Sequence, residues 1–329
     1  MLCIIDNHTD DPYWNLAAEE YLLTSFSEPI FRIWRNRDSI IVGKNQNTFA
    51  EINIDFVERN NIAVVRRLTG GGTVFHDLGN VNYTFIDRKN DAESTDEMFR
   101  RFTAPIIRAL KSLGVEACLS GRNDLLIDGR KFSGNAICIH GDRLLQHGTL
   151  LFQSSMNNLT EALIVHEDKF KGKGVKSTRS RVTNISEHLP VRKSTDEFFN
   201  YMADFCISEG NFHEYHYTDE DISAINSLAD SKYRCREWNY GKSPKCSISH
   251  RRKFPSGILE LSFDIEKGHI SNLNINGDYF FKAPTEELCR MLNGEPFEKE
   301  KIIDRLSNVA IDDYFSGIDT NQFVSLLFT

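Results

Sequence analysis

Three consecutive glycines, Gly70–Gly72, lie in the stretch RRLTGGGTVFHD between two arginines and a His-Asp pair. Glycine adopts positive φ readily and lets backbone N–H groups approach a ligand without a Cβ in the way. Such N–H groups bind the oxygens of phosphates and carboxylates. The spacing fits neither a Walker loop nor a Rossmann turn. The stretch therefore predicts either a tight turn between strands or an anion site, and the flanking charges favour the anion site.

A second polar cluster lies in GRNDLLIDGRKFSGNA, Gly121 to Ala136. The Asp-Gly pair at 128–129 is a typical hairpin turn. It places Asn123, Asp124 and Lys131 on paired strands. A lysine among small residues can carry a compact charge into a narrow site. A solvent-exposed hairpin lysine is the alternative interpretation.

Two further features could serve an anion site. His147 opens the apolar strand QHGTLLF, although a single histidine is more often structural than catalytic. Residues 166–184, HEDKFKGKGVKSTRSRVTN, are basic and non-periodic, which indicates a mobile surface loop. This loop is either a solvated run of charge or a lid that closes over a nucleotide. Its basic residues are Lys169, Lys171, Lys173, Lys176, Arg179 and Arg181.

The chain has 329 residues, with 47 acidic and 39 basic side chains and a net charge of −8. This balance argues against a general nucleic-acid-binding protein, which is usually basic. The seven cysteines form no C-x-x-C pair, which indicates reduced thiols and a cytoplasmic location. The N-terminal residues lack the charge and the apolar run of a signal peptide. No apolar run reaches the roughly 20 residues needed to cross a bilayer.

Hydrophobic periodicity and turn residues place these motifs on a mixture of helices and strands. Asp11-Pro12 predicts a helix start, and Ser94 with Glu97 predicts a capping box before a helix in which Pro105 causes a kink or a later start. We expect strands at 2–5, 30–34, 39–42, 62–67, 81–86, 125–127 and 144–152. We expect helices at 13–26, 53–60, 99–113, 195–209 and 219–230. Residues 238–250 are expected to form a linker, followed by a hairpin at 257–275 and helices near 285–292 and at the C-terminus.

In this order and spacing, the motifs resemble those of the lipoate-protein ligase A family. They are R-R-x-x-G-G-G-x-V-F-H-D from Arg66, G-R-N-D-L from Gly121, R-K-x-S-G-x-A from Arg130, H-G-T-L-L from His147 and K-S-x-R-S-R-V-T-N from Lys176. D-P-x-x-N-L-A from Asp11 and W-R-N from Trp34 match as well. The resemblance runs from about Asp11 to the C-terminal end. Each motif alone is of moderate specificity, and their common register makes the resemblance strong.

The resemblance implies an α+β fold of the biotin/lipoate-ligase type. We expect a catalytic domain over residues 1–245, with a mixed, mostly antiparallel sheet and flanking helices, and a small α+β accessory domain over residues 246–329. It also implies an enzyme that uses ATP and Mg²⁺ to activate lipoate as lipoyl-AMP, with release of pyrophosphate. The lipoyl group then passes to a lysine of an apo lipoyl domain, either in the E2 subunit of a 2-oxoacid dehydrogenase or in the glycine-cleavage H protein. Neither nucleic acid nor a membrane is an expected partner.

The resemblance also carries site residues over to matching positions. Lys131 is implied as the catalytic residue, contacting both the lipoate carboxylate and the α-phosphate. Asp124 is implied near the phosphates, where it would hold Mg²⁺. The implied ATP- and adenylate-binding residues are Arg67, Gly70, Gly71, Gly72, Thr73, Val74, Phe75, Asp124, Lys131, Lys176 and Arg179. The implied lipoate-binding residues are Trp34, Arg67, His76, Asn123, Lys131, Gly134 and His147.

Two other functions stay open at the level of sequence. An octanoyl or lipoyl transferase of the same fold passes the acyl group through a cysteine thioester without ATP, and Cys118 lies close to where such a cysteine is sought. A non-catalytic binder of adenylate or lipoyl domains would have lost Lys131 or the glycines, and this chain keeps both. Leu68 and Phe132 depart from the family pattern and leave the preference between lipoate and octanoate open.

Overall fold

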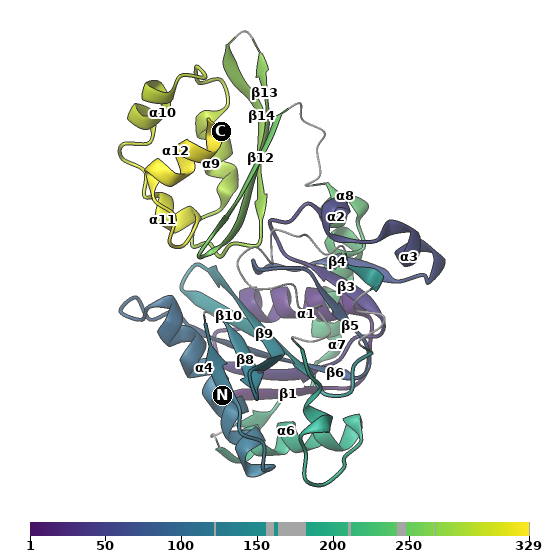
Figure 1. Ribbon diagram of the computed structural model, residues 1–329. Coiled ribbons are helices and arrows are strands. Elements are labelled where there is room, and N and C mark those ends of the chain that lie inside the picture. Colours follow the sequence, from purple (N-terminus) through teal and green to yellow (C-terminus); the bar gives the residue numbers. More distant parts are fainter. Residues whose placement is uncertain are drawn as a thin grey trace.

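The computed structural model describes residues 1–121, 123–155, 161–163, 182–209, 212–241, 248–266 and 268–328 (Figure 1). The N-terminal part contains an eight-stranded sheet and a small three-stranded sheet, and the C-terminal part has a three-stranded sheet of its own. In the eight-stranded sheet two strand pairings are parallel and five are antiparallel. The expected α+β fold with a mixed, mostly antiparallel sheet is confirmed.

The eight-stranded sheet has the order β11-β1-β2-β6-β10-β9-β8-β7. Its strands are β1 (Leu2–Asp6), β2 (Ile30–Trp34), β6 (Asn80–Arg88), β7 (Cys118–Ser120), β8 (Asp124–Ile127), β9 (Arg130–His140), β10 (Arg143–Leu151) and β11 (His213–Glu214). The small sheet has the order β4-β3-β5, with β3 (Ser39–Val42), β4 (Ala63–Arg66) and β5 (Val74–His76). Strands β2 and β3 follow each other in sequence but belong to different sheets. The glycines connect β4 to β5 at the edge of the small sheet.

Helices cover both faces of the large sheet. α4 and α6 pack on one face together, and α1 contacts β6 and β10 on the other. The helices of this part are α1 (Pro12–Ser25), α2 (Thr48–Glu51), α3 (Ile54–Arg59), α4 (Thr95–Ser112), α6 (Thr195–Glu209), α7 (Asp219–Leu228) and α8 (Arg236–Tyr240). A 3₁₀ turn spans Ile185–Glu187 and a π-helical turn spans Ala229–Tyr233.

Strand β6 shows how the large sheet separates polar from apolar side chains. Its odd-numbered residues 81–85 are valine, tyrosine and phenylalanine, and they belong to the core formed with α4 and α6. Its even-numbered residues 80–84 are two asparagines and a threonine on the opposite face, because side chains alternate along a strand. Thr84 there donates to Glu19 of α1. The strand is therefore buried on both faces but carries polar groups on one of them.

The helix starts expected from the sequence are confirmed. Asp11 caps α1 through its side chain, and Ser94 with Glu97 forms the capping box of α4. α4 continues through Pro105 as one helix, so the alternative of a later start is wrong. The carbonyl that loses its backbone partner to Pro105 belongs to Arg101, on the exposed side of the helix where water can bind it.

The linker expected at 238–250 is partly wrong. Residues 236–240 form α8, and this helix packs against strand β4. Trp238 Nε1 donates to the carbonyl of Arg66 at 2.8 Å, and Asn239 Oδ1 accepts the backbone N–H of Arg66 at 2.9 Å. These tertiary hydrogen bonds stabilise a helix that local sequence alone does not predict. Residues 242–247, which include the domain boundary expected between 245 and 246, lie outside the described residues.

The C-terminal part packs its helices on a sheet with its own hydrophobic core. Its antiparallel strands are β12 (Ile248–Phe254), β13 (Gly257–Glu266) and β14 (His269–Gly277). Its helices are α9 (Thr285–Leu292), α10 (Lys299–Arg305), α11 (Ile311–Tyr314) and α12 (Thr320–Leu327). In Figure 1 this part stands above the large sheet. The expected hairpin at 257–275 and the helix at 285–292 are confirmed.

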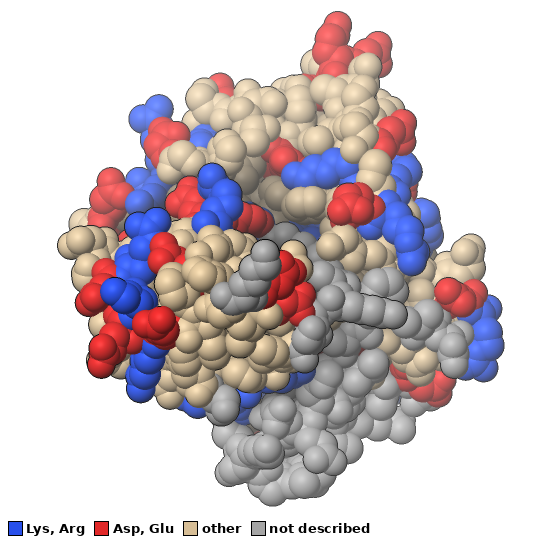
Figure 2. All heavy atoms as spheres, turned by 90° about the horizontal axis from the view of Figure 1, so that it is seen from above, with Lys and Arg blue, Asp and Glu red and all other residues tan. Residues whose placement is uncertain are grey.

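The end of β14 and the segment after it join the C-terminal part to the N-terminal part. The N–H of Gly277 donates to the carbonyl of Asn45 at 2.8 Å. Phe280 is 5% exposed and lies in the core of the large domain, with its ring 5.6 Å from that of Phe99. Acidic and basic side chains are both scattered around the rim of the face seen from above, with tan residues between them (Figure 2). Within the described ranges, every helix is too short or too polar to cross a bilayer.

Candidate active site

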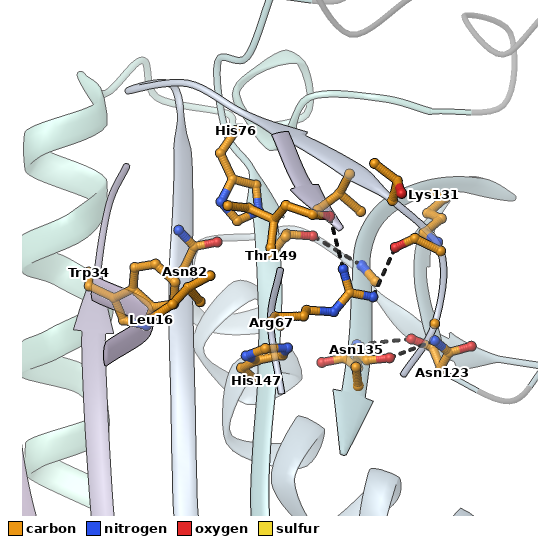
Figure 3. A pocket seen from close by; sticks show the side chains of 18 residues that line it. Leu16, Trp34, Arg67, His76, Asn82, Asn123, Lys131, Asn135, His147 and Thr149 are labelled. Atoms are coloured by element: carbon orange, nitrogen blue, oxygen red, sulfur yellow. Dashed lines mark hydrogen bonds between the residues drawn. The ribbon is translucent and has the colours of Figure 1, made fainter. Parts of the chain in front are cut away.

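A pocket of about 150 Å³ opens where the small sheet meets the large one (Figure 3). Eleven of its lining residues were expected from the sequence: Trp34, Arg67, Gly71, Gly72, Thr73, Val74, His76, Asn123, Lys131, Gly134 and His147. Seven were missed: Leu16, Ile41, Asn82, Asn135, Ala136, Gly148 and Thr149. Gly70, Phe75 and Asp124 do not line it, and Lys176 and Arg179 lie outside the described residues, as does most of the basic loop.

The pocket runs across the strands rather than along them. Trp34 of β2 is paired with Asn82 of β6, and Asn82 is paired with Thr149 of β10. Thr149 Oγ1 accepts the N–H of Gly134 in β9 at 3.2 Å. Since neighbouring strands lie about 4.8 Å apart, this row of residues spans roughly 14 Å from β2 to β9. Figure 3 shows Trp34 and His76 toward one end of it and Lys131 toward the other.

The three glycines are required for three different reasons. A Cβ on Gly70 would lie 2.4 Å from the carbonyl oxygen of Tyr279, so the approach of the C-terminal part excludes a side chain there. Gly71 has φ of +88°, which favours glycine. A Cβ on Gly72 would meet nothing within 4 Å, and Gly72 lines the pocket. Only Gly72 therefore keeps space free that a ligand could use.

Arg66 does not line the pocket, so of the two arginines that precede the glycines only Arg67 can face a bound anion. Its side chain is fully buried, and burial lowers its pKa to about 10. The guanidinium donates to the carbonyls of Gly43, Lys44, Gln46, Trp238 and Asn239 and to the hydroxyl of Thr48. Arg66 is thus a structural cross-link between the loop after β3 and α8.

Arg67 braces the glycine loop from inside the pocket. Its Nη2 donates to the carbonyls of Gly70 and Gly72 at 2.7 and 2.9 Å. In a trans peptide the following N–H points opposite to the carbonyl, so the N–H groups of Gly71 and Thr73 point away from the guanidinium. Burial lowers the pKa of Arg67 to about 10, which leaves it charged at neutral pH. The result is a fixed loop with a buried positive charge behind it.

A chain of hydrogen bonds joins the Trp34 end of the pocket to Glu19 beneath it. Trp34 Nε1 donates to Thr84 Oγ1 at 2.9 Å, and Thr84 donates to Glu19 Oε1 at 2.5 Å. Glu19 is 3% exposed, and burial alone would raise its pKa. The charge and hydrogen bond of His147, with the bond from Thr84 and the charge of Arg32, lower the pKa overall and keep the carboxylate ionised.

The same chain continues from Glu19 to the glycine loop. His147 Nδ1 lies 3.0 Å from the Glu19 carboxylate, and its Nε2 lies 2.8 Å from Thr69 Oγ1. Thr69 also accepts Arg67 Nε at 2.8 Å. His147 therefore lines the pocket and at the same time connects Glu19 to the arginine that holds the glycines.

Lys131 reaches the pocket because of a β-bulge. In β9 the alternating residues Gly134 and Ala136 line the pocket, so the even-numbered Phe132 would be next. The register between β8 and β9 shifts between Leu125 and Leu126, which makes Phe132 the extra residue and puts Lys131 on the pocket face. Phe132 turns into the core and is fully buried. A Cβ on Gly134 would lie 3.1 Å from Lys131 Nζ, so glycine there leaves room for the ammonium.

Lys131 Nζ lies 2.7 Å from Asp124 Oδ1, and both side chains are more than one-third exposed. The two residues are neighbours as expected, although Asp124 does not line the pocket. In the described part of the chain, no group of three or more His, Cys, Asp or Glu side chains is arranged to hold a metal ion. A metal at this position would need most of its ligands from a bound substrate.

Asn123 is held in place by Asn135. Asn123 Nδ2 donates to the carbonyl of Asn135 at 2.6 Å, and Asn135 Nδ2 donates to the carbonyl of Asn123 at 3.0 Å. The hydroxyl of Tyr83 donates to Asn135 Oδ1. A Cβ on Gly148 would lie 2.3 Å from that oxygen, so Gly148 makes room for this bond.

Leu68 and Phe132, which depart from the family pattern, do not line the pocket. Leu68 packs partly buried against a separate apolar cluster that includes Leu22 and Ile30. Cys118 is exposed in β7 at the edge of the large sheet. The described residues of the pocket include no cysteine.

Two of the seven lining residues that sequence reasoning missed, Asn82 and Asn135, are buried polar groups on strands. Asn82 lies between Val81 and Tyr83 in the strand expected at 81–86, and a polar residue between apolar ones in a strand is a usable signal because buried polar groups need partners. Thr69 and Glu19 act through His147 and gave no signal, since their partners come from distant parts of the chain.

Two protein-family models match this chain. A family model of the lipoyl protein ligase A/B catalytic domain matches residues 11–206. A model of the bacterial lipoate protein ligase C-terminus matches residues 243–327. Together these models cover both parts of the structure described above.

Individual proteins are similar to this chain in sequence and in structure. The lipoate-protein ligase LplJ of Bacillus subtilis (strain 168) is 42% identical over 333 aligned positions, which cover 100% of this chain and 100% of that protein. The crystal structure of P. falciparum LipL1 in complex with lipoate has a TM-score of 0.75 at 27% identity, covering 98% of this chain and 97% of that one. A crystal structure of lipoate-protein ligase A bound with ATP has a TM-score of 0.64 at 27% identity, covering 73% and 98%. The chain belongs to the lipoate-protein ligase family.

Proposed function

We propose that this chain activates lipoate with ATP and transfers the lipoyl group to a protein lysine. The observation that carries the proposal is the pocket, which has Lys131 toward one end and the apolar Trp34 and Leu16 toward the other. Gly71 and Gly72 also line it. Family membership supports the same reaction, because one structural relative is described with lipoate and another with ATP. An acid with a charged head and an apolar tail fits such a pocket.

In the first step a lipoate carboxylate oxygen attacks the α-phosphorus of ATP. The bond from that phosphorus to the bridging oxygen breaks, pyrophosphate leaves, and lipoyl-AMP remains. Both reactants are anions, so a fixed cation and aligned N–H donors stabilise the transition state. Lys131 supplies the cation, and the loop of Gly71, Gly72 and Thr73 supplies N–H groups. Arg67 keeps that loop rigid by donating hydrogen bonds to the carbonyls of Gly70 and Gly72.

In the second step the acceptor lysine amine attacks the carbonyl carbon of lipoyl-AMP. The bond from that carbon to the phosphate oxygen breaks, AMP leaves, and the nitrogen gives up a proton to solvent as the amide forms. The mixed anhydride is already activated, so no nucleophilic side chain of this chain is required. The absence of cysteine from the described pocket lining agrees with this route rather than with a thioester.

Mg²⁺ fits the site only together with the nucleotide. Mg²⁺ binds through one or two carboxylates plus substrate phosphates, and Asp124 offers one carboxylate beside Lys131. Asp124 would hold the ion, whose chemistry is to neutralise phosphate charge. Lys176 and Arg179, which lie outside the described residues, are proposed to close over the adenylate.

The proposed acceptors are apo lipoyl domains of E2 subunits and the H protein, as the family resemblance implies. The proposed division at residues 245 and 246 separates the site from the C-terminal part. That part has its own hydrophobic core, which supports the division. The proposed compartment is the cytoplasm, supported by six free cysteines among the described residues.

Pyrophosphate release tests the proposal. The wild-type chain should release pyrophosphate only when lipoate, ATP and Mg²⁺ are all present. Cys118→Ser should keep both this release and acyl transfer, because Cys118 lies outside the pocket. Acyl transfer without ATP, or its loss in Cys118→Ser, would instead establish the transferase.

A further inference from the structure

The V-T-N part of the basic motif, Val182 to Asn184, lies beside the pocket without lining it. Thr183 is 1% exposed, so its side chain cannot contact a ligand in the pocket. Val182 nevertheless forms a parallel β-bridge with Lys131, and the N–H of Thr183 donates to the carbonyl of Lys131 at 2.9 Å. The motif therefore contacts, through its backbone, the lysine that we assign to catalysis.

Lys131 lies where the sheet gives its backbone little support. In the described chain the pairing of β9 with β10 ends at Asn135 and Gly148, so the β10 edge of β9 is open nearer to Lys131. On the other edge the pairing with β8 is interrupted by the bulge, whose extra residue is left out of the ladder. Val182 and Thr183 thus supply the neighbour that Lys131 does not receive from β10.

A 3₁₀ turn brings hydrogen-bond partners back to the hydroxyl of Thr183. The turn spans Ile185–Glu187 and ends at His188. His188 Nε2 lies 2.9 Å from Thr183 Oγ1, and Glu187 Oε2 accepts from the same hydroxyl at 3.3 Å. His188 Nδ1 also lies 3.5 Å from Asp128 Oδ2, in the turn between β8 and β9. The hydroxyl is therefore connected, through His188, to the hairpin that carries the catalytic lysine.

The residues that follow Thr183 are anchored separately to the end of β10. Asn184 Oδ1 accepts the N–H of Ser154 at 2.9 Å, and Asn184 Nδ2 donates to the carbonyl of Ser154 at 3.1 Å. Ile185 is fully buried in the core of the large domain. Since this anchor does not involve the Thr183 hydroxyl, removing the hydroxyl can shift the local backbone without unfolding the segment.

We propose that Thr183 is a positioning residue for adenylation, because its buried hydroxyl orients the backbone N–H that holds the carbonyl of Lys131. The inference rests on the proposed function, since it takes Lys131 as the cation of the first step. The Lys131 side chain is more than one-third exposed, so packing does little to fix it and its backbone must be held. A displacement of about 1 Å at such a group can lower the rate roughly a hundredfold.

The test measures kcat and KM for pyrophosphate release in Thr183→Val and Thr183→Ser. Valine keeps the volume of the side chain but removes the hydroxyl, whereas serine keeps the hydroxyl. Thr183→Val should lower kcat roughly tenfold or more with little change in KM, because the pocket lining is unaltered and the loss falls on the transition state. Thr183→Ser should stay close to wild type. Equal losses in the two variants would overturn the proposal.

A double-mutant cycle separates positioning from a general structural effect. If Thr183 acts through Lys131, then Lys131→Ala combined with Thr183→Val should be no slower than Lys131→Ala alone. Losses that multiply would overturn the proposal. Thr103→Val is the matched control, since Thr103 is a fully buried threonine of α4 whose hydroxyl donates to the carbonyl of Phe99 at 2.7 Å. This control should keep the wild-type kcat.

Amide hydrogen exchange tests the contact independently of activity. The amide at position 183 should be protected in the wild type and in Thr183→Ser, and should exchange several-fold faster in Thr183→Val. Equal exchange in all three would overturn the proposal. If Thr183→Val does not fold, His188→Phe removes a partner of the hydroxyl and should lower kcat in the same way. A wild-type chain that releases no pyrophosphate would remove the proposed function and the role in adenylation, whereas faster exchange in Thr183→Val would still support the hold on Lys131.

Discussion

Lys131 faces the pocket because one extra residue interrupts the alternation of β9. The sequence indicated the lysine, its hairpin and its neighbour Asp124, since a turn at 128–129 and small residues are local signals. The bulge at Phe132 was not predictable, because its register depends on how β8 and β9 pair. The sequence therefore predicted that Lys131 belongs to the site, but not the β-bulge that turns its side chain toward the pocket.

Replacing Lys131 tests its role without disturbing the fold. Lys131→Ala should reduce adenylation by roughly 10²- to 10³-fold, the usual effect of removing one transition-state contact. Its ion pair with Asp124 is more than one-third exposed, so the melting temperature should change little. Pyrophosphate release and thermal unfolding measure the two effects. Lys131→Arg is the control for charge, and near wild-type activity of Lys131→Ala would refute the assigned role.

His76 predicts a specific pH dependence of stability. Burial and the charge of Arg67 lower its pKa to about 3 in the folded chain, below the usual value of about 6.5 in an unfolded chain. Between these values the unfolded state binds more protons, so the free energy of unfolding falls as pH decreases from 6.5 toward 3, by up to about 1.4 kcal/mol per pH unit.

Urea unfolding at pH 7 and pH 5 checks this dependence. The wild type should lose more stability between these pH values than His76→Gln, because glutamine does not titrate. The difference between the two proteins isolates His76 from the buried carboxylates, which titrate in both. Equal losses would show that folding does not lower the pKa of His76.

The glycine loop is the element in which local and long-range causes combine. Its sequence indicated an anion site as a whole, but the three glycines have separate reasons. The positive φ of Gly71 is a turn property that sequence can suggest. The contact of Gly70 with the carbonyl of Tyr279 depends on a segment about two hundred residues away, so no local pattern could reveal it. The prediction of a linker at 238–250 was partly wrong for the same reason, because hydrogen bonds to the distant Arg66 stabilise α8.

Gly70→Ala and Gly72→Ala form a matched pair that separates these causes. Gly70→Ala places a Cβ 2.4 Å from a backbone oxygen and should lower the melting temperature by several degrees. Gly72→Ala meets open space and should leave the melting temperature nearly unchanged while raising the KM for ATP. Differential scanning fluorimetry and initial rates measure both. A destabilised Gly72→Ala with normal KM would contradict this division.

At the scale of the whole molecule, the C-terminal part supports the site through the segment after β14. Phe280 enters the core of the large domain, and the Cβ position of Gly71 lies 3.9 Å from its ring. The sequence predicted a separate C-terminal unit but not this contact, because hydrophobicity at 279–281 does not identify which core receives it. The fold class followed from motif order, whereas the docking of the two parts needed the structure.

Phe280→Ala tests that support. Removing a buried phenylalanine costs about 3–5 kcal/mol, so the variant should unfold at lower urea concentration and bind ATP more weakly through a loosened glycine loop. Phe281→Ala is the control, because Phe281 is only partly buried and contacts Lys44 instead. Equal effects of the two substitutions on ATP binding would show that Phe280 has no special link to the loop.

The central claim is that one pocket forms lipoyl-AMP and then passes the acyl group to a protein lysine. To test this, the chain is incubated with lipoate, ATP and Mg²⁺, and unbound small molecules are removed. Mass spectrometry then records the bound adduct before and after an apo lipoyl domain is added. We expect non-covalent lipoyl-AMP on the chain, followed by its loss and the gain of one lipoyl mass on the acceptor. A covalent acyl group on the chain itself, or acceptor lipoylation without ATP, would contradict it.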